Sequence, residues 1–138
     1  MGDEQEVLAA NAAFYDAFAA RDADGMAALW ARRTPVACIH PGWDVLRGRD
    51  AVLASWRGIL GGPGSPPITC ADAVAHVHGD SAVVVCREHI PDVELIATNV
   101  FVREDGAWRI VHHHASSVAH AAPEAEEEEP DPGSGTLH

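Results

Sequence analysis

The chain has 138 residues, 47% of them hydrophobic, and a formal net charge of −12 at neutral pH. This length predicts one domain with a core of its own, and the acidic excess argues against nucleic acid or an anionic membrane as partner, because phosphates would be repelled. The three cysteines, Cys38, Cys70 and Cys86, have neither the CxxC spacing of a zinc site nor the even number of a disulfide framework. The acidic opening residues and the lack of a run of about 20 apolar residues lead us to expect a cytoplasmic protein.

Three helices are predicted in the first half of the chain. Residues 3–21 carry apolar side chains at helical spacing, and Asp3 followed by Glu6 is typical of a helix start. A second helix is expected over about 24–32 and a third over about 49–60.

Short segments separate these helices. The stretch TPVACIH (34–40) predicts a strand that ends at Pro41-Gly42, and GGPGSPP (61–67) is typical of a loop.

From residue 68 the pattern changes to strands rich in Val, Ile and Thr, expected over 68–78, 81–90, 94–104 and 107–118. Gly79-Asp80, Pro91-Asp92 and Asp105-Gly106 mark the turns between them, and Asp-Gly is typical of a tight hairpin. The sequence therefore predicts an α+β fold in which three N-terminal helices pack on a curved antiparallel sheet.

The last part of the chain differs in composition. Residues 121–138 are acidic and nearly free of hydrophobic side chains, which is typical of a disordered tail. We expect one domain over 1–120, followed by this tail over 121–138.

The stretch WRIVHHHASS (108–117) contains three consecutive histidines on the last predicted strand. Side chains alternate along a strand, so His112 and His114 share one face and His113 points to the other. A hairpin centred on Asp105-Gly106 pairs Asn99 with His112, which predicts that His112 and His114 face the interior. The interior face predicted in this way carries Val84, Cys86, Glu88, Leu95, Ala97, Asn99, Phe101, Trp108, Ile110, His112, His114 and Ser116.

The opposite face of this sheet is dominated by valine. It carries Val83, Val85, Thr98, Val100, Val102, Val111 and His113. Three helices can cover only one face of the sheet, and an apolar face requires a cover. We therefore expect a homodimer packed through the valine-rich face.

Three stretches carry a resemblance to a known family: NAAFYDAFAARDADGMAALW (11–30), CIHPGWDVLRGRDAVLASW (38–56) and ATNVFVREDGAWRIVHHHAS (97–116). The chain resembles the nuclear transport factor 2-like superfamily, in particular its SnoaL-like branch. The resemblance implies a cone whose open end admits a small, usually apolar molecule, commonly in a dimer. Members include ketosteroid isomerases, polyketide cyclases and dehydratases, so the fold alone does not fix the function.

The chain departs from the ketosteroid isomerase pattern. It has a single tyrosine, Tyr15, and no Asp on the predicted interior face of the strands, which argues against that chemistry.

If the protein is an enzyme, we expect His112 or His114 to act as general base in an isomerisation, dehydration or cyclisation beside a carbonyl. Asn99 would orient that histidine or donate to a developing oxyanion. The ligand-binding residues expected around them are Tyr15, Trp30, His40, Trp43, Glu88, Phe101, Trp108 and Ser116.

Two alternatives remain open at this point. His112 and His114 could chelate a metal with His40 or Glu88 as third ligand, although we expect polar pocket lining with neither metal nor cofactor. The protein could also be a non-catalytic binding or dimerisation module.

Overall fold

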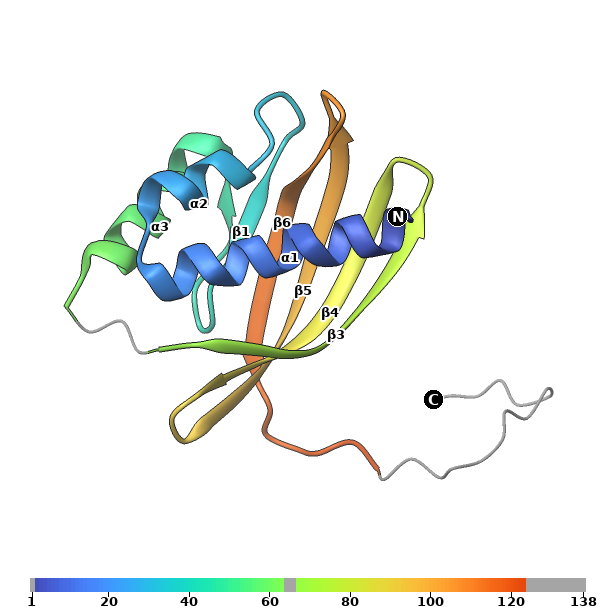
Figure 1. Ribbon diagram of the computed structural model, residues 1–138. Helices are drawn as coiled ribbons and strands as arrows, with labels where there is room; N and C mark the ends of the chain where they lie inside the picture. The colour runs from blue at the N-terminus through green and yellow to red at the C-terminus, as the bar shows by residue number, and fades with distance from the viewer. Residues whose placement is uncertain (1, 64–66, 124–138) are drawn as a thin grey trace.

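The structure is a computed structural model that describes residues 2–63 and 67–123. In this part of the chain three helices precede one six-stranded sheet of strand order β2-β1-β6-β5-β4-β3. Figure 1 shows the curved, unclosed sheet with α1 lying across it. The α+β architecture predicted from the sequence is confirmed. The elements are α1 (Asp3–Ala20), α2 (Ala23–Leu29), β1 (Ala37–Ile39), β2 (Leu46–Arg47), α3 (Arg49–Gly61), β3 (Thr69–His78), β4 (Ser81–Ile90), β5 (Val93–Glu104) and β6 (Ala107–Ser117).

The starts of the helices follow local chemistry. The N-cap of α1 is Gly2, and Asp3 lies inside the first turn, where its charge favours the helix dipole. Helix α2 begins at a conventional cap, because the Asp22 carboxylate accepts a hydrogen bond of 2.9 Å from the Gly25 backbone N–H.

The long hairpins have the tight turns that the sequence predicts. Ile90 pairs with Val93 and Glu104 pairs with Ala107, so each turn contains two residues. Both residues of the second turn adopt positive φ, at 55° for Asp105 and 78° for Gly106, as a tight hairpin requires.

Two features at the other edge of the sheet were not predicted. Leu46 and Arg47 form the short strand β2, and β1 pairs in parallel with β6 so that Cys38 lies beside His113. This parallel pairing brings residues near position 40 next to the three histidines.

A β-bulge in the β5–β6 ladder decides which histidine faces inward. Phe101 pairs with Ile110, as predicted, but Val100 pairs with His112, so Val111 is an extra residue on β6. The extra residue inverts the alternation beyond it, and Asn99 therefore pairs with His113. His113 is buried, whereas His114 and Ser116 are exposed and His112 is half-buried on the outer face. The prediction that His112, His114 and Ser116 face the interior and His113 the exterior is wrong.

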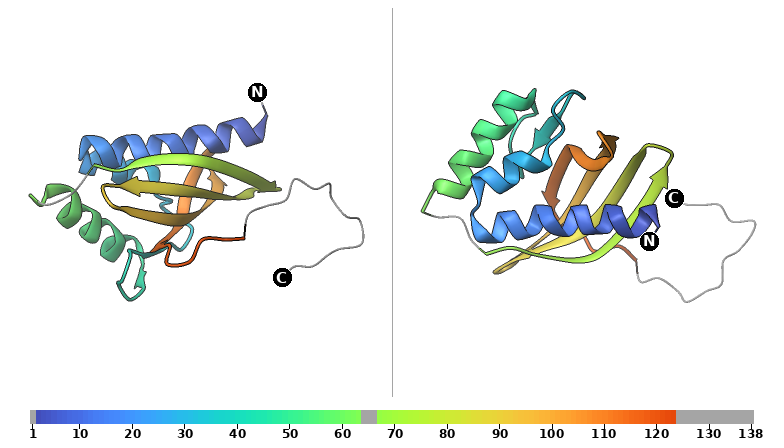
Figure 2. Two further views of the ribbon diagram at one scale, coloured as in Figure 1. Left: turned by 90° about the horizontal axis from the view of Figure 1, so that it is seen from below. Right: turned by 45° about the horizontal axis from the view of Figure 1, so that its top comes forward.

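The core lies between the helices and the inner face of the sheet (Figure 2). Its largest fully buried apolar side chains include Phe14 of α1, Trp56 of α3, Phe101 of β5 and Ile110 of β6, together with Trp30 just after α2. Of the expected tail, residues 121–123 are exposed and 124–138 lie outside the described residues.

Candidate functional site

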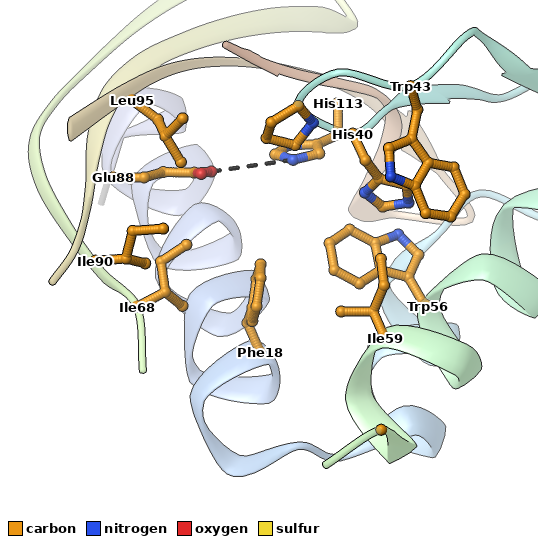
Figure 3. Close-up of a pocket in the computed structure, with 12 residues that line it drawn as sticks. Phe18, His40, Trp43, Trp56, Ile59, Ile68, Glu88, Ile90, Leu95 and His113 are labelled. Carbon is orange, nitrogen blue, oxygen red and sulfur yellow. Dashed lines mark ion pairs between the residues drawn. The ribbon is translucent and has the colours of Figure 1, made fainter. Parts of the chain in front are cut away.

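A cavity of about 400 Å³ opens between α1, α3 and the inner face of the sheet. Figure 3 shows an aromatic side with His40, Trp43 and Trp56, and an aliphatic side with Ile68, Ile90 and Leu95 across the space. Volume and apolar lining both match the pockets that hold small molecules. The described lining residues are Phe18, His40, Pro41, Trp43, Trp56, Ile59, Gly62, Ile68, Glu88, Ile90, Leu95 and His113.

His113 is a polar group on the wall of this cavity and is only 2% exposed. Its Nδ1 lies 2.6 Å from Asn99 Oδ1, an atom that can only accept, so Nδ1 carries the proton. The Nε2 atom of the neutral ring then holds the lone pair. Burial lowers the pKa of His113 to about 3, so the ring is neutral near neutral pH and its Nε2 lone pair is free to accept a hydrogen bond.

Glu88 lies across from His113 and is also 2% exposed. Its Oε2 accepts a hydrogen bond of 2.6 Å from the Tyr15 hydroxyl. Burial raises the pKa of Glu88 and outweighs the opposing effect of that hydrogen bond, because an ionised carboxylate is poorly solvated in an apolar cavity. The protonated carboxyl group is thus favoured relative to an exposed glutamate.

The gap between His113 and Glu88 is of a size that lets one ligand atom contact both side chains. His113 Nε2 and Glu88 Oε2 are 3.9 Å apart, a separation drawn as a dashed line in Figure 3 and too long for a direct hydrogen bond. One oxygen atom placed beside the pair can reach both. A proton acceptor and a proton donor therefore face the same point in an apolar cavity.

Side chains of α1 hold this pair in place. Asn99 Nδ2 donates to Asn11 Oδ1 at 2.9 Å and to the Tyr15 hydroxyl at 3.2 Å, which turns its Oδ1 toward His113. Asn11, Tyr15 and Asn99 are all buried. The helix thus fixes both the tautomer of His113 and the position of the Glu88 carboxyl.

His40 forms a second polar point on the aromatic side. Its Nε2 is 2.9 Å from Ser55 Oγ, and its ring packs edge-on against Trp43 and Trp56 with centroids 4.9 and 4.8 Å away. Burial lowers the pKa of His40 to about 4, so this ring is also neutral near neutral pH. The His113 pKa and the His40 pKa are both low, and so the histidine side of the cavity holds no positive charge at neutral pH.

The sequence-predicted site residues divide into three groups. His40, Trp43 and Glu88 line the cavity, and Tyr15 and Asn99 contact its polar groups from behind. Trp30, Phe101 and Trp108 are buried core residues outside the described lining of the cavity. His112, His114 and Ser116 lie on the outer face, because the bulge at Val111 inverts the alternation of side chains beyond it.

Sequence reasoning missed His113, and it did not name Trp56, a core residue that also lines the cavity, among the ligand-binding residues. The sequence did contain a signal for His113. Inward strand residues are usually apolar, so Ala115 fits the inward face better than Ser116 does, and His113 shares a face with Ala115. The adjacent apolar pair Ile110-Val111 marks the point where the alternation breaks.

The metal alternative finds no support in the geometry. Among the described residues, no group of three or more His, Cys, Asp or Glu side chains is arranged to hold a metal ion. His112 and His114 lie side by side with ring centroids 6.4 Å apart, away from Glu88 and His40, which line the cavity on the other face.

Comparison with known proteins agrees with the fold. The sequence pattern of the SnoaL-like domain matches residues 7–120. The chain belongs to the SnoaL-like family. This SnoaL-like chain is similar in structure to a candidate dehydratase of the NTF2-like family from Streptomyces avermitilis, with a TM-score of 0.77 and 34% identity over 84% of this chain and 96% of that one.

Two further relatives carry different descriptions. A candidate calcium/calmodulin-dependent protein kinase type II association domain from Thiobacillus denitrificans is 40% identical over 80% of this chain and 94% of that one, with a TM-score of 0.72. F-box protein SKIP8 of Arabidopsis thaliana is 26% identical over 80% of this chain, which spans only 48% of that protein. Within the described residues, no helix of this SnoaL-like chain has the length and apolar character needed to cross a membrane.

Proposed function

We propose that the cavity binds a small, uncharged, largely apolar molecule that carries a hydroxyl group, and that His113 and Glu88 transfer protons on it. The observation that carries this proposal is the gap of 3.9 Å between His113 Nε2 and Glu88 Oε2. A hydroxyl group can donate to the lone pair of Nε2 and accept from a protonated Glu88, whereas a carbonyl oxygen can only accept. An apolar body would fill the space between the aromatic and aliphatic sides.

The reaction that fits best is loss of water from a β-hydroxycarbonyl compound. His113 Nε2 removes the proton from the carbon beside the carbonyl, and the Glu88 carboxyl gives its proton to the departing hydroxyl, which leaves as water. Because the two groups are adjacent, the proton and the hydroxyl would leave from the same side of the substrate. In an isomerisation, His113 would remove a proton from one carbon and the Glu88 carboxyl would give its own proton to another carbon, with no loss of the hydroxyl group. The description of the Streptomyces avermitilis relative as a candidate dehydratase supports the loss of water over the isomerisation.

A matched pair of histidine variants tests this assignment. We expect 3-hydroxy-1-indanone to quench the fluorescence of Trp43 and Trp56, which line the cavity. His113→Phe should weaken this binding about tenfold, since a lost buried hydrogen bond costs about 1–3 kcal/mol, while His112→Phe on the outer face should leave it unchanged.

Turnover is followed in the same samples by the absorbance of the enone product. Glu88→Gln, which cannot deliver a proton, should bind the probe but not dehydrate it. Equal binding by wild type and His113→Phe would contradict the proposed site, and binding without dehydration by the wild type would leave the non-catalytic pocket as the function.

The outer face of the sheet supports a second proposal, a homodimer. The helices lie on the other side (Figure 2), and Val74 and Val85 are 52% and 42% exposed. This outer face includes Val74, Val83, Val85, Ile96, Thr98, Val100, Val102, His112 and His114. It differs from the predicted face in that His112 and His114 replace His113, Val74 and Ile96 are added, and Val111, the bulge residue, is no longer part of it. The description of the Thiobacillus denitrificans relative as an association domain also supports assembly.

A further inference from the structure

His40 lines the cavity on its aromatic side, and the proposed proton transfer makes no use of it. It follows β1 directly and is only 3% exposed. Buried polar atoms in proteins nearly always have a hydrogen-bond partner. The partners of the two ring nitrogens therefore indicate what His40 can bind.

The ring proton of His40 lies on Nε2. Ser55 Oγ donates its own proton to the Val52 backbone oxygen at 2.7 Å, so toward His40 Nε2, 2.9 Å away, it can only accept. Burial keeps the ring neutral near neutral pH by lowering the pKa of His40 to about 4. A neutral imidazole has one N–H, and Nδ1 therefore holds the lone pair.

The Nδ1 lone pair has no aligned donor in the part of the chain that the structure describes. Cys38 Sγ lies 3.9 Å from Nδ1 but 3.7 Å from Nε2. A lone pair of imidazole points away from the ring, so an atom in line with it would be much nearer to Nδ1 than to Nε2. Figure 3 shows a ring nitrogen of His40 on the side of the open space. A bound molecule can supply the missing donor.

The position of His40 limits where that donor can be. The ring centroids of His40 and His113 are 6.4 Å apart, and both rings line the same cavity. Substituents at different positions of one small ring system are separated by distances of this order. Trp43 and Trp56 pack against His40 and hold it in place.

We propose that His40 Nδ1 accepts a hydrogen bond from a second hydroxyl group of the bound molecule, a phenol on an aromatic ring that packs against Trp43 and Trp56. This inference rests on the proposed function, which assigns the first hydroxyl to His113 and Glu88. A phenol is more acidic than an aliphatic alcohol and donates more strongly to an imidazole nitrogen, and its flat ring suits an aromatic wall. His40 would thus select phenolic molecules over apolar ones of the same size.

The test compares 1-indanol with its isomers that carry one additional hydroxyl on the benzene ring, by calorimetric titration of the full chain. 1-Indanol has the hydroxyl for His113 and Glu88 but no carbonyl, so it cannot undergo the proposed dehydration. We expect at least one phenolic isomer to bind about 3- to 10-fold more tightly than 1-indanol, the gain from one net hydrogen bond. The methyl ether of that isomer, which cannot donate, should lose the gain.

Variants assign the gain to His40. The ratio of the two dissociation constants should fall to about one in His40→Phe, and because the ratio is taken within one variant, it does not depend on a general change in affinity. Ser55→Ala frees the Nε2 proton and should reduce the gain, whereas Ser55→Thr keeps a hydroxyl on α3 and should restore it.

Nitrogen NMR gives a direct reading in the wild type. The phenolic isomer should shift the Nδ1 signal of His40, identified by its absence from His40→Phe, and 1-indanol should not. A gain that persists in His40→Phe, or an Nδ1 signal that no isomer moves, would overturn the role of His40.

The failure of this inference and that of the proposed function give different results. If His113→Phe weakens the binding of 1-indanol but no phenolic isomer binds more tightly than 1-indanol, the proposed site stands and the role of His40 falls. If neither 1-indanol nor any isomer binds, both fall.

Discussion

Asn99 Oδ1 lies 2.6 Å from His113 Nδ1, and both side chains are buried. The Asn99 amide nitrogen already donates to Asn11 and Tyr15, so the direction of the side chain is set by α1. His113 consequently carries its proton on Nδ1 and presents a lone pair on Nε2 to the cavity. A helix at the start of the chain thus fixes the protonation of a histidine near its end.

Asn99→Leu tests this dependence. The substitution leaves His113 Nδ1 and Asn11 Oδ1 without the partner they have in the wild type, and an unpaired buried polar group costs about 1–3 kcal/mol. We expect the free energy of unfolding in urea to fall by about that amount or more. In nitrogen NMR spectra the single His113 tautomer of the wild type should become a mixture.

An exposed residue of α3, away from the proposed dimer face, supplies the control. Arg57→Ala should change the free energy of unfolding by only about 0.5 kcal/mol. A His113 tautomer that is the same in Asn99→Leu and in the wild type would contradict the proposed role of Asn99.

The pH dependence of stability provides a second prediction, through His40. Burial lowers the pKa of His40 to about 4 in the folded chain, against about 6.5 when unfolded. Between these values the unfolded chain binds a proton that the folded chain does not, so stability falls as the pH falls from about 6.5 to about 4. The pKa of His113 is lowered to about 3, so protonation of this residue on unfolding also reduces stability on acidification, over a wider pH range.

The measurement compares urea unfolding of wild type and His40→Phe at several pH values. The variant should lose less stability on acidification, because it has one fewer histidine to protonate on unfolding. The raised pKa of Glu88 has the opposite sign, with stability lost as the pH rises through the raised value, but it is common to both chains and cancels in the comparison. Identical pH slopes would show that His40 is not held neutral by burial.

Much of the fold follows from local signals in the sequence. The Asp105-Gly106 turn and the alternation of Val84, Cys86 and Glu88 place the long hairpins correctly, because turn chemistry and side-chain period are both short-range properties. The same signals predicted Glu88 as an inward polar residue.

The candidate site was harder to predict, because it depends on two non-local features. The bulge at Val111 exchanges His113 for His112 and His114, and one extra residue leaves little trace in the composition of a strand. The parallel pairing of β1 with β6 brings His40 near His113, with ring centroids 6.4 Å apart, although 73 positions separate them in the sequence. No local pattern specifies that contact.

Glu104 gives a third prediction, on the segment that leads into β1. Its carboxylate accepts backbone hydrogen bonds from Arg32, Arg33 and Thr34 at 2.8 to 3.0 Å, and these lower its pKa to about 2. Its stabilising contribution is complete above the unfolded pKa of about 4.3 and is lost as the pH falls toward 2. Glu104→Gln has one acceptor oxygen in place of two and should lower the melting temperature at pH 7.

The effect of Glu104→Gln should shrink as the pH falls from about 4 toward 2, since the unfolded wild-type chain then binds a proton at Glu104 that the folded chain does not. Glu94→Gln is the matched control, because Glu94 forms an ion pair with Arg87 that is exposed to solvent. Equal melting temperatures for Glu104→Gln and Glu94→Gln at pH 7 would show that the Glu104 hydrogen bonds do not anchor this segment.

The last prediction concerns the proposed homodimer. Val100 lies in the middle of the outer face, paired with Val83 on β4 and His112 on β6. Light scattering at micromolar concentration should give twice the chain mass for the wild type. Val100→Glu would bury an unpaired charge at the interface and should yield monomers, whereas Ala54→Glu, at an exposed position of α3, should remain dimeric.

Because Val100 points away from the cavity, monomeric Val100→Glu should still bind 3-hydroxy-1-indanone, which separates assembly from ligand binding. A monomeric wild type would rule out the dimer and leave the outer face as solvent-exposed surface.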